Sequence, residues 1–406
     1  MATAEAGGQH EPVPLLHPVD GLPPVVVTLE ALAATADAVA AGCGPIAVDA
    51  ERASGFRYSQ RAYLVQLRRG GAGTALVDPV PFGGDLSALA PALTDPEWVL
   101  HAANQDLPCL AEAGLAPSRL FDTELAGRLA GLPRVGLGPM VEHLLGLSLE
   151  KGHGAADWSR RPLPENWLVY AALDVEVLIE LRDVLAGMLE EQGKLEWAMQ
   201  EFEAVRTAGP PAPRAEPWRR TSGIHKIRKP AALAIVRALW EARDELAAER
   251  DIAPGRVLPD AAIVDAASTA PPTAQALAAM PVFRGRAQRR LTAYWWAAVE
   301  AAARLGPQDL PAGSPPSDGP PPVARWADRD PAAAARLTAA RAAVGTISAE
   351  RDVPVENLLL PDLLRRLCWS PPEDGDVPAA LRRGGAREWQ VDLLGELLTR
   401  AVATRP

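Results

Sequence analysis

The sequence predicts a mixed α/β domain followed by two all-helical modules. The chain has 406 residues, which is too long for one compact core. Up to about residue 205, short apolar runs of strand length alternate with amphipathic helical runs. Beyond that point the pattern is helical, and Pro-rich linkers at 208–216 and 306–324 divide it. We therefore expect one domain at 23–207 and two modules at 217–305 and 325–406.

The first domain is expected to begin with a helix and to contain four strands. Residues 1–22 are polar and interrupted by Pro and Gly, so we expect a flexible N-terminus there. A helix is expected over residues 29–41, with Thr28 as its N-cap and Gly42 at its end. Four apolar runs have strand length, and the Gly-rich turn at 69–73 between the second and the third predicts an antiparallel meander. These runs are Ile46–Glu51, Tyr63–Leu67, Thr74–Asp78 and Trp98–Ala102.

Helices are expected around this sheet. The spacing of apolar residues predicts one long helix, from about residue 165 to 188, and several shorter ones. The shorter helices are expected at about 86–93, 106–113, 123–130 and 140–145.

The two helical modules share two short phrases in the same order, which indicates that they are divergent copies. Ala248-Glu-Arg-Asp-Ile252 matches Ala349-Glu-Arg-Asp-Val353, and Val257-Leu-Pro-Asp260 matches Leu359-Leu-Pro-Asp362. In both copies a charged helix ends, a turn follows, and a Pro begins the next helix. A repeated helical unit of this size is more typical of binding than of catalysis.

Composition and charge narrow the class of protein. Residues 1–209 carry a net charge of −14 and residues 210–305 carry +6, an asymmetry that suits a metal-dependent enzyme acting on a polyanion. The three widely spaced cysteines predict a reducing, cytoplasmic location, and neither a signal peptide nor a membrane span is expected. The sequence contains no Gly-rich phosphate-binding loop, so ATP use is not expected. It contains no Ser/His/Asp array either, so serine hydrolase chemistry is not expected.

A group of acidic residues is the strongest functional signal. Asp49 and Glu51 lie two residues apart at the end of the first strand, so both side chains project from one face. Such a pair favours a divalent cation with oxygen ligands, Mg²⁺ or Mn²⁺, although an ordinary strand end with two solvated acids is the alternative. Asp106 is expected in the first turn of a helix, where the helix dipole stabilises its charge. Tyr170 and Asp174 share one face of the long helix.

The order of these residues resembles that of a known family. Asp49-x-Glu51, Asp106 and Tyr170-xxx-Asp174 are similar to the three motifs of the DEDD exonuclease superfamily, in its tyrosine subclass. Other phrases are similar to the ribonuclease D family, and the basic module resembles the helicase-and-RNase-D C-terminal (HRDC) domain. The phrases are Tyr63-Leu-Val-Gln-Leu, Leu76-Val-Asp-Pro, His101-Ala-Ala-Asn-Gln-Asp-Leu, Phe121-Asp-Thr-Glu and Asp157-Trp-Ser-Arg-Arg-Pro-Leu.

This resemblance implies an exonuclease domain with an RNase H-like mixed sheet flanked by helices, followed by two HRDC-type domains. It implies a monomer that hydrolyses RNA from the 3′ end, as in tRNA precursors, with two divalent metal ions, Mg²⁺ or Mn²⁺. Asp49, Glu51 and Asp174 would bind the ion that activates water. Asp49 would bridge to the second ion, Asp106 would assist there, and Tyr170 would orient the water. Two alternatives stay open, namely an exonuclease that acts on DNA and a catalytically idle RNA-binding protein.

Three residues of the first domain are further candidates for contacts with nucleic acid. Gln66 is expected to face the substrate groove, and Lys151 and His153 lie in a Gly-flanked loop that is expected near a phosphate. Arg160 and Arg161 either hold a phosphate or form a solvated pair. For His101 a structural role is expected.

The basic module contains two clusters of cationic residues. Arginines with nearby aromatic residues suit contact with a nucleic-acid backbone and stacking on bases. For Tyr294, Trp295 and Trp296, however, positions in the core are expected. The two clusters are Arg219, Arg220, Lys226, Arg228, Lys229 and Arg284, Arg286, Arg289, Arg290.

Overall fold

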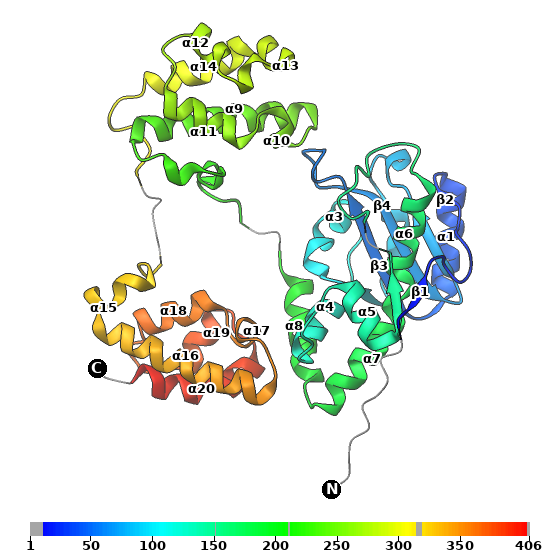
Figure 1. Ribbon diagram of the computed structural model, residues 1–406. Helices are drawn as coiled ribbons and strands as arrows, with labels where there is room; N and C mark the ends of the chain where they lie inside the picture. The colour runs from blue at the N-terminus through cyan, green and yellow to red at the C-terminus, as the bar shows by residue number, and fades with distance from the viewer. Residues whose placement is uncertain (1–10, 151, 210–211, 314–318, 404–406) are drawn as a thin grey trace.

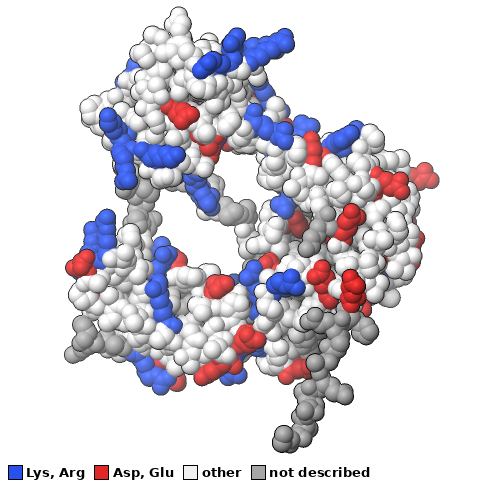
Figure 2. All heavy atoms as spheres, viewed as in Figure 1, with Lys and Arg blue, Asp and Glu red and all other residues white. Residues whose placement is uncertain are grey.

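Three bodies surround an open passage in this protein (Figure 1, Figure 2). The structure, a computed structural model, describes residues 11–150, 152–209, 212–313 and 319–403. The first body is a mixed α/β domain, and the other two are helical modules. The second module contacts one end of the first domain, and the third module packs beside helix α8 (Leu195–Thr207).

A six-stranded mixed sheet forms the centre of the first domain, in the order β2-β5-β4-β3-β6-β7. Strands β3, β4 and β5 pair antiparallel, as the turn at 69–73 predicts, and the other neighbours are parallel. Strands β2 and β7 were not predicted, because segments as short as these show no recognisable alternation of apolar and polar residues. The strands are β2 Val25–Val26, β3 Cys43–Arg52, β4 Ala62–Gly70, β5 Gly73–Val77, β6 Glu97–Leu100 and β7 Arg119–Asp122.

Helices flank this sheet (Figure 1). The Thr28 hydroxyl accepts a hydrogen bond from the Ala31 N–H at 3.2 Å and so caps the first helix, as the sequence predicts. Short 3₁₀ turns precede two of the helices. The helices before α8 are α1 Leu29–Ala41, α2 Ala90–Leu93, α3 Leu107–Glu112, α4 Thr123–Leu129, α5 Leu137–Leu145, α6 Glu165–Glu176 and α7 Leu178–Glu191.

Two expectations about this domain are corrected by the structure. The long helix expected from about residue 165 to 188 is two helices, α6 and α7, which meet at Val177. Helix α6 packs on β3, β4 and β5, whereas α7 packs on β3 and β6, and one straight helix cannot follow both directions. The flexible N-terminus expected at 1–22 contains a strand, β1 (Val13–Leu15), which pairs parallel with β8 (Leu147–Leu149).

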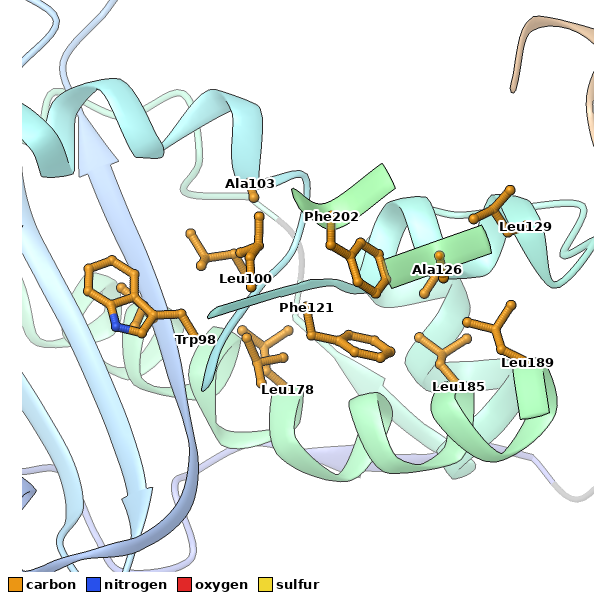
Figure 3. Packing of buried hydrophobic residues seen from close by; sticks show 14 of the residues in the cluster. Trp98, Leu100, Ala103, Phe121, Ala126, Leu129, Leu178, Leu185, Leu189 and Phe202 are labelled. Carbon is orange, nitrogen blue, oxygen red and sulfur yellow. The ribbon is translucent and has the colours of Figure 1, made fainter. Parts of the chain in front are cut away.

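The core of the first domain lies between β6, β7 and the helices α4, α7 and α8 (Figure 3). The rings of Phe121 on β7 and Phe202 on α8 lie 4.7 Å apart, and both side chains are buried. Leu178, Leu185 and Leu189 of α7 complete this layer. This packing holds β6 in place, and the chain leaves β6 directly toward Asp106.

The second module is a helical bundle with its own core. Trp295 is fully buried, the Tyr294 hydroxyl donates a hydrogen bond to the Ala242 carbonyl at 2.7 Å, and Trp296 packs against the core. The prediction that these three aromatics are core residues is therefore confirmed. The helices are α9 Pro230–Arg250, α10 Pro254–Val257, α11 Asp260–Thr269, α12 Ala274–Ala279, α13 Arg286–Arg290 and α14 Thr292–Ala303.

The third module repeats the beginning of the second. Helices α9 and α16 both have 21 residues, and each ends at an aspartate in the left-handed region, Asp251 with φ of 47° and Asp352 with φ of 48°. A four-residue helix and a longer helix follow in both modules. The helices of the third module are α15 Trp326–Arg329, α16 Pro331–Arg351, α17 Val355–Leu358, α18 Pro361–Trp369, α19 Val377–Arg383 and α20 Glu388–Val402.

Each module has a defined contact with the first domain. The β3–β4 loop reaches the second module, where the Ala253 N–H donates to the Phe56 carbonyl at 3.0 Å and the Tyr58 hydroxyl donates to the Asp244 carboxylate at 3.1 Å. In the third module the Trp389 indole stacks on Trp197 of α8. The Trp389 indole N–H also donates to the buried carboxylate of Glu201 at 3.0 Å. The loop that follows the acidic pair on β3 is thus held by the second module.

Candidate active site

Three carboxylates from two elements meet at the end of β3. Asp49 and Glu51 project from the same face of β3, and Asp174 comes from α6, which packs across that face. One oxygen from each of the three groups lies within 4.8 Å of the others. The expectation that these residues lie together is therefore met by the geometry, and oxygen ligands at this separation suit Mg²⁺ or Mn²⁺.

Asp106 extends this group on the side of Asp49. Its side chain is hydrogen-bonded to that of Asp49, and its carboxylate forms an ion pair with Arg52 at 3.1 Å. Asp49 thus lies between two sets of carboxylates, with Glu51 and Asp174 on one side and Asp106 on the other.

The turn that carries Asp106 is held by another buried acid, Asp122. Its carboxylate accepts hydrogen bonds from the N–H groups of Ala102 and Ala103, at 3.1 and 2.9 Å. The same carboxylate caps α4, since it accepts from the N–H groups of Glu124 and Leu125. Ala102 has a φ of 58°, which few non-glycine residues adopt, so this support maintains an unusual turn.

Burial raises the pKa of all four carboxyl groups. The pKa of Asp49 rises to about 6, because burial outweighs a backbone hydrogen bond and the charge of Arg52. Burial together with the neighbouring carboxylates raises the pKa of Asp106 to about 8 and that of Glu51 to about 10. Burial and the charge of Asp49 raise the pKa of Asp174. Full ionisation of the four groups would give more negative charge than Arg52 can neutralise, and a bound divalent cation would compensate that excess.

Tyr170 lies one turn before Asp174 on α6, and its hydroxyl is hydrogen-bonded to that carboxylate. Burial and the nearby carboxylates raise the pKa of the Tyr170 phenol well above its usual value, so the group is neutral at pH 7. The ring of His153 packs edge-on against Tyr170 with centroids 5.6 Å apart. Tyr170 therefore offers a fixed, neutral hydroxyl beside the carboxylates.

Two cavities flank the carboxylate group. A cavity of about 370 Å³ contacts Asp49, Asp174 and Tyr170, and its other walls come largely from the start of α5 and the end of β8. A second cavity of about 240 Å³ contacts Glu51 and Arg52 and the loop around Gly154. The first is the larger of the two spaces that open on the acidic group.

Several candidates for nucleic-acid contacts in the first domain have other roles. Gln66 pairs with Asp49 across the strands but is 0% exposed beneath α6, so the prediction that it faces the groove is wrong. Arg161 binds both carboxylate oxygens of the buried Asp78, at 2.6 and 2.7 Å, so it has a structural role that neither of the two alternatives predicts. His153 packs beside Tyr170, so it lies near the site as expected. Lys151 falls outside the described residues.

The cations of the second module divide into one structural residue and two exposed clusters. Arg219 is half-buried, pairs with Glu216 at 2.6 Å and lies over the Trp218 ring at 4.2 Å, so its predicted role in binding RNA is not supported. We name the exposed residues Arg220, Lys226, Arg228 and Lys229 the passage cluster, because segment 217–229 borders the opening in Figure 1. We name Arg284, Arg286, Arg289 and Arg290 the α13 cluster, which lies at the far end of the module.

Sequence reasoning missed two residues that organise the site. Arg52 directly follows the motif Asp49-x-Glu51, and only the fold brings it against Asp106. Asp122 was noted as part of a phrase, but nothing in its neighbourhood indicated four backbone partners. The Asp-Thr-Glu sequence before a helix is an N-cap pattern, and that signal was available.

Comparisons with known proteins agree with this geometry. The family model described as 3′-5′ exonuclease matches residues 24–190, and the HRDC domain model matches residues 232–299. Residues 319–402 match a model described as 3′ to 5′ exonuclease C-terminal domain. A second HRDC-type domain was predicted at 325–406, and since a different family model matches there, that assignment stays a prediction.

Curated relatives extend the match beyond single domains. Ribonuclease D from Gluconacetobacter diazotrophicus is 34% identical over 285 residues, which cover 68% of this chain and 71% of that protein. The chain belongs to the ribonuclease D family. The ribonuclease D of Granulibacter bethesdensis is 33% identical and is covered over 68% of its length.

Two solved structures match nearly the whole length of this chain. A protein from Bifidobacterium adolescentis is 40% identical with a TM-score of 0.91, over 97% of this chain and 100% of that one. Escherichia coli RNase D, described as an exoribonuclease involved in structured RNA processing, is 26% identical with a TM-score of 0.68. That match covers 94% of this chain and 98% of that one.

Membership in the ribonuclease D family makes the first domain a 3′–5′ exonuclease domain with an RNase H-like mixed sheet. The chain is a 3′–5′ exoribonuclease of this family, and exonucleases of its superfamily use divalent metal ions. Among the described residues, no helix is both long enough and apolar enough to cross a membrane.

Proposed function

We propose that this ribonuclease D-type enzyme removes nucleotides from the 3′ ends of structured RNA, such as tRNA precursors, at the carboxylate group on β3 and α6. The observation that carries this proposal is the meeting of Asp49, Glu51 and Asp174 within 4.8 Å beside Tyr170. In a ribonuclease D fold, this group opens into a cavity large enough for a nucleotide. A monomeric state and a cytoplasmic location stay predictions.

Asp49, Glu51 and Asp174 would hold one divalent cation, and Asp49 with Asp106 would hold a second. When bound, the two ions supply a nucleophilic water and stabilise the charge on the leaving oxygen. Arg52, which pairs with Asp106, partly offsets the charge of these acids and orients the Asp106 carboxylate. The raised pKa values fit this assignment, because the four acids are mutually repulsive without a cation.

The neutral hydroxyl of Tyr170 would orient the attacking water. The phenol is not a base at neutral pH, since its pKa is raised, so its contribution is a hydrogen bond and a fixed position. The carboxylate of Asp174 keeps the hydroxyl in place. Tyr170 would thus act on the chemical step more than on RNA binding.

We expect Tyr170→Phe to lower kcat by about 10²-fold with little change in KM, since misplacement of a reacting group by about 1 Å costs about this much. Tyr63→Phe is the matched control, because Tyr63 is buried and its hydroxyl has no partner. Steady-state rates on a 3′-hydroxyl RNA measure both variants. A kcat for Tyr170→Phe equal to that of the control would remove Tyr170 from the mechanism.

RNA and DNA substrates separate this proposal from its two alternatives. Matched single strands of each, labelled at the 5′ end, would be incubated with Mg²⁺, Mn²⁺ or EDTA. We expect stepwise shortening of the RNA with either ion and none in EDTA. Faster shortening of DNA would favour a DNA exonuclease, and binding without shortening would favour an idle RNA-binding protein.

The second module is proposed to bind the RNA backbone through its exposed cations. Each phosphate contact with single-stranded nucleic acid adds about 0.7 to the slope of log affinity against log salt concentration. We expect replacement of the four passage-cluster residues by Gln to lower the magnitude of this slope by up to about 3. The same change in the α13 cluster is the matched comparison, and we expect a smaller effect there because those residues lie farther from the passage. Wild-type slopes in both variants would contradict the proposed role of the module.

A further inference from the structure

His101, for which the sequence predicts a structural role, lies in the wall of the larger cavity beside the carboxylate group. It follows β6 directly and is half-buried. One ring nitrogen, Nδ1, lies 3.0 Å from the buried hydroxyl of Thr123. The imidazole also lines the 370 Å³ cavity together with Asp49, Tyr170 and Asp174. Because the Nδ1 edge is turned toward Thr123, the exposed part of the ring, with Nε2, faces the cavity.

The hydrogen bonds around Thr123 determine which nitrogen carries the proton. The Thr123 hydroxyl donates its one hydrogen to the Leu100 carbonyl oxygen at 3.2 Å. Toward His101 the hydroxyl oxygen can then only accept, so Nδ1 carries the hydrogen and donates it. In a neutral imidazole the other nitrogen, Nε2, is left with a lone pair and is an acceptor.

The neutral state of the ring follows from its surroundings. Burial lowers the pKa of His101 to about 4, and the charge of Glu124 offsets only part of this effect. Within the part of the chain that the structure describes, Nε2 has no hydrogen-bond partner. The Nε2 atom of His101 is therefore a neutral acceptor that is available to a ligand in the cavity.

The rest of the cavity makes this acceptor distinctive. Leu137, Leu149 and Leu178 supply apolar walls, which suit the faces of a base or a sugar. The carboxylates of Asp49 and Asp174 are committed to a cation in the proposed function. Glu150 and Tyr170 also line this space, and His101 adds a neutral acceptor for a donor on a terminal sugar that enters it.

The backbone at His101 is also fixed more firmly than a surface loop. The next two residues, Ala102 and Ala103, donate their N–H groups to the buried carboxylate of Asp122. Thr123, which holds the ring, is the residue after Asp122 and is 0% exposed. Ring and backbone are thus positioned by the same short segment at the start of α4.

We propose that His101 Nε2 accepts a hydrogen bond from a hydroxyl group of the 3′-terminal ribose. The inference rests on the proposed function, since it assigns the terminal nucleotide to this cavity. A bond to the 2′-hydroxyl would make His101 a residue that selects RNA over DNA, because only RNA carries that group. A bond to the 3′-hydroxyl would make it select an unblocked end.

The test compares three RNA oligonucleotides that differ only in the last sugar, which is ribose, 2′-deoxyribose or 3′-deoxyribose. First-nucleotide release by the wild type, His101→Leu and His101→Gln is measured with Mg²⁺. The ratio of the ribose rate to each deoxy rate is the readout, because partial misfolding lowers all rates equally and leaves the ratio unchanged. Asn104→Leu, an exposed position on the same turn, is the control variant.

We expect His101→Leu to lower one of the two ratios by about 3- to 10-fold, the range of a net neutral hydrogen bond. The other ratio stays at the wild-type value, and the affected ratio identifies the hydroxyl. His101→Gln, which keeps an acceptor oxygen, retains part of the ratio. Wild-type ratios in His101→Leu would overturn the inference.

A variant that no longer hydrolyses RNA can still be tested by a binding measurement. Adenosine 5′-monophosphate and its 2′-deoxy and 3′-deoxy forms are titrated into each variant with Mg²⁺, and the same ratios are taken from the affinities. This experiment also separates the two proposals. A wild type that binds the monophosphates but releases no nucleotide from RNA contradicts the proposed function, while the affinity ratios still decide the role of His101.

Discussion

Replacement of Asp174 by Asn is expected to lower RNA hydrolysis by at least about 10³-fold, or about 4 kcal/mol of transition-state stabilisation. Asp174 is one of three carboxylates within 4.8 Å of one another, and it also holds the Tyr170 hydroxyl. The fold should survive, because Asn keeps the size of the side chain, and burial already favours the neutral form of Asp174 when no metal is bound. We therefore expect the melting temperature of the variant in EDTA to equal or exceed that of the wild type.

Asp183→Asn is the matched control for this variant. Asp183 lies on α7 and is largely exposed, and it pairs with Arg182 at 2.9 Å away from the carboxylate group. Single-turnover rates with Mg²⁺ and thermal melts in EDTA compare the two proteins. Wild-type hydrolysis by a folded Asp174→Asn protein would refute the assignment of the site.

The second large effect is expected from the metal ions themselves. Mg²⁺ at about 100 times its dissociation constant should stabilise the folded enzyme by about 3 kcal/mol. For a domain of this size, that free energy corresponds to a rise in melting temperature of about 5–10 °C. Thermal melts of the whole chain with Mg²⁺ and with EDTA measure the difference.

The pH dependence of this stabilisation follows from the raised pKa values. In the folded protein without metal, the pKa values of Asp49, Asp106 and Glu51 lie at about 6, 8 and 10, above their ordinary values. The folded state then binds more protons than the unfolded state, so this contribution to stability is present below about pH 4 and is lost as the pH rises toward 10. Mg²⁺ displaces these protons, and we expect the rise in melting temperature to grow from pH 6 to pH 9.

The same experiment on Asp174→Asn supplies the control for this linkage. The variant should show a smaller rise with Mg²⁺ and a flatter pH dependence in EDTA, since one repulsive charge is gone. A rise that is independent of pH in the wild type would show that the carboxylates are already ionised without metal. The account of the electrostatics would then be wrong, although the site could still bind the ion.

The carboxylate group could be predicted because each motif has a local geometry. Alternation along a strand places Asp49 and Glu51 on one face, and helical spacing places Tyr170 beside Asp174. The relative position of the strand and the helix is a property of the fold. The resemblance to a known family predicted that relative position, and in the structure the carboxylates of the strand and of the helix lie together.

The errors concern burial, which depends on packing between distant elements. The alternation of side chains along β4 correctly places Gln66 on the sheet face that carries Asp49. Its side chain is nevertheless completely buried beneath α6, and no local pattern in the sequence indicates that burial. Arg219 was grouped with cations by sequence, whereas its contacts with Glu216 and Trp218 make it part of the module's own structure. His101 was expected to be structural, and only the position of its free nitrogen in the cavity raises another role.

The most direct test uses one RNA sequence in linear and circular form, incubated with the enzyme in Mg²⁺ and in EDTA. The account predicts that the linear RNA loses single nucleoside 5′-monophosphates from its 3′ end in Mg²⁺, while the circle stays intact and EDTA stops the reaction. Cleavage of the circle, or shortening of the linear RNA in EDTA, would contradict the conclusion that this carboxylate group is a metal-dependent 3′–5′ exonuclease centre.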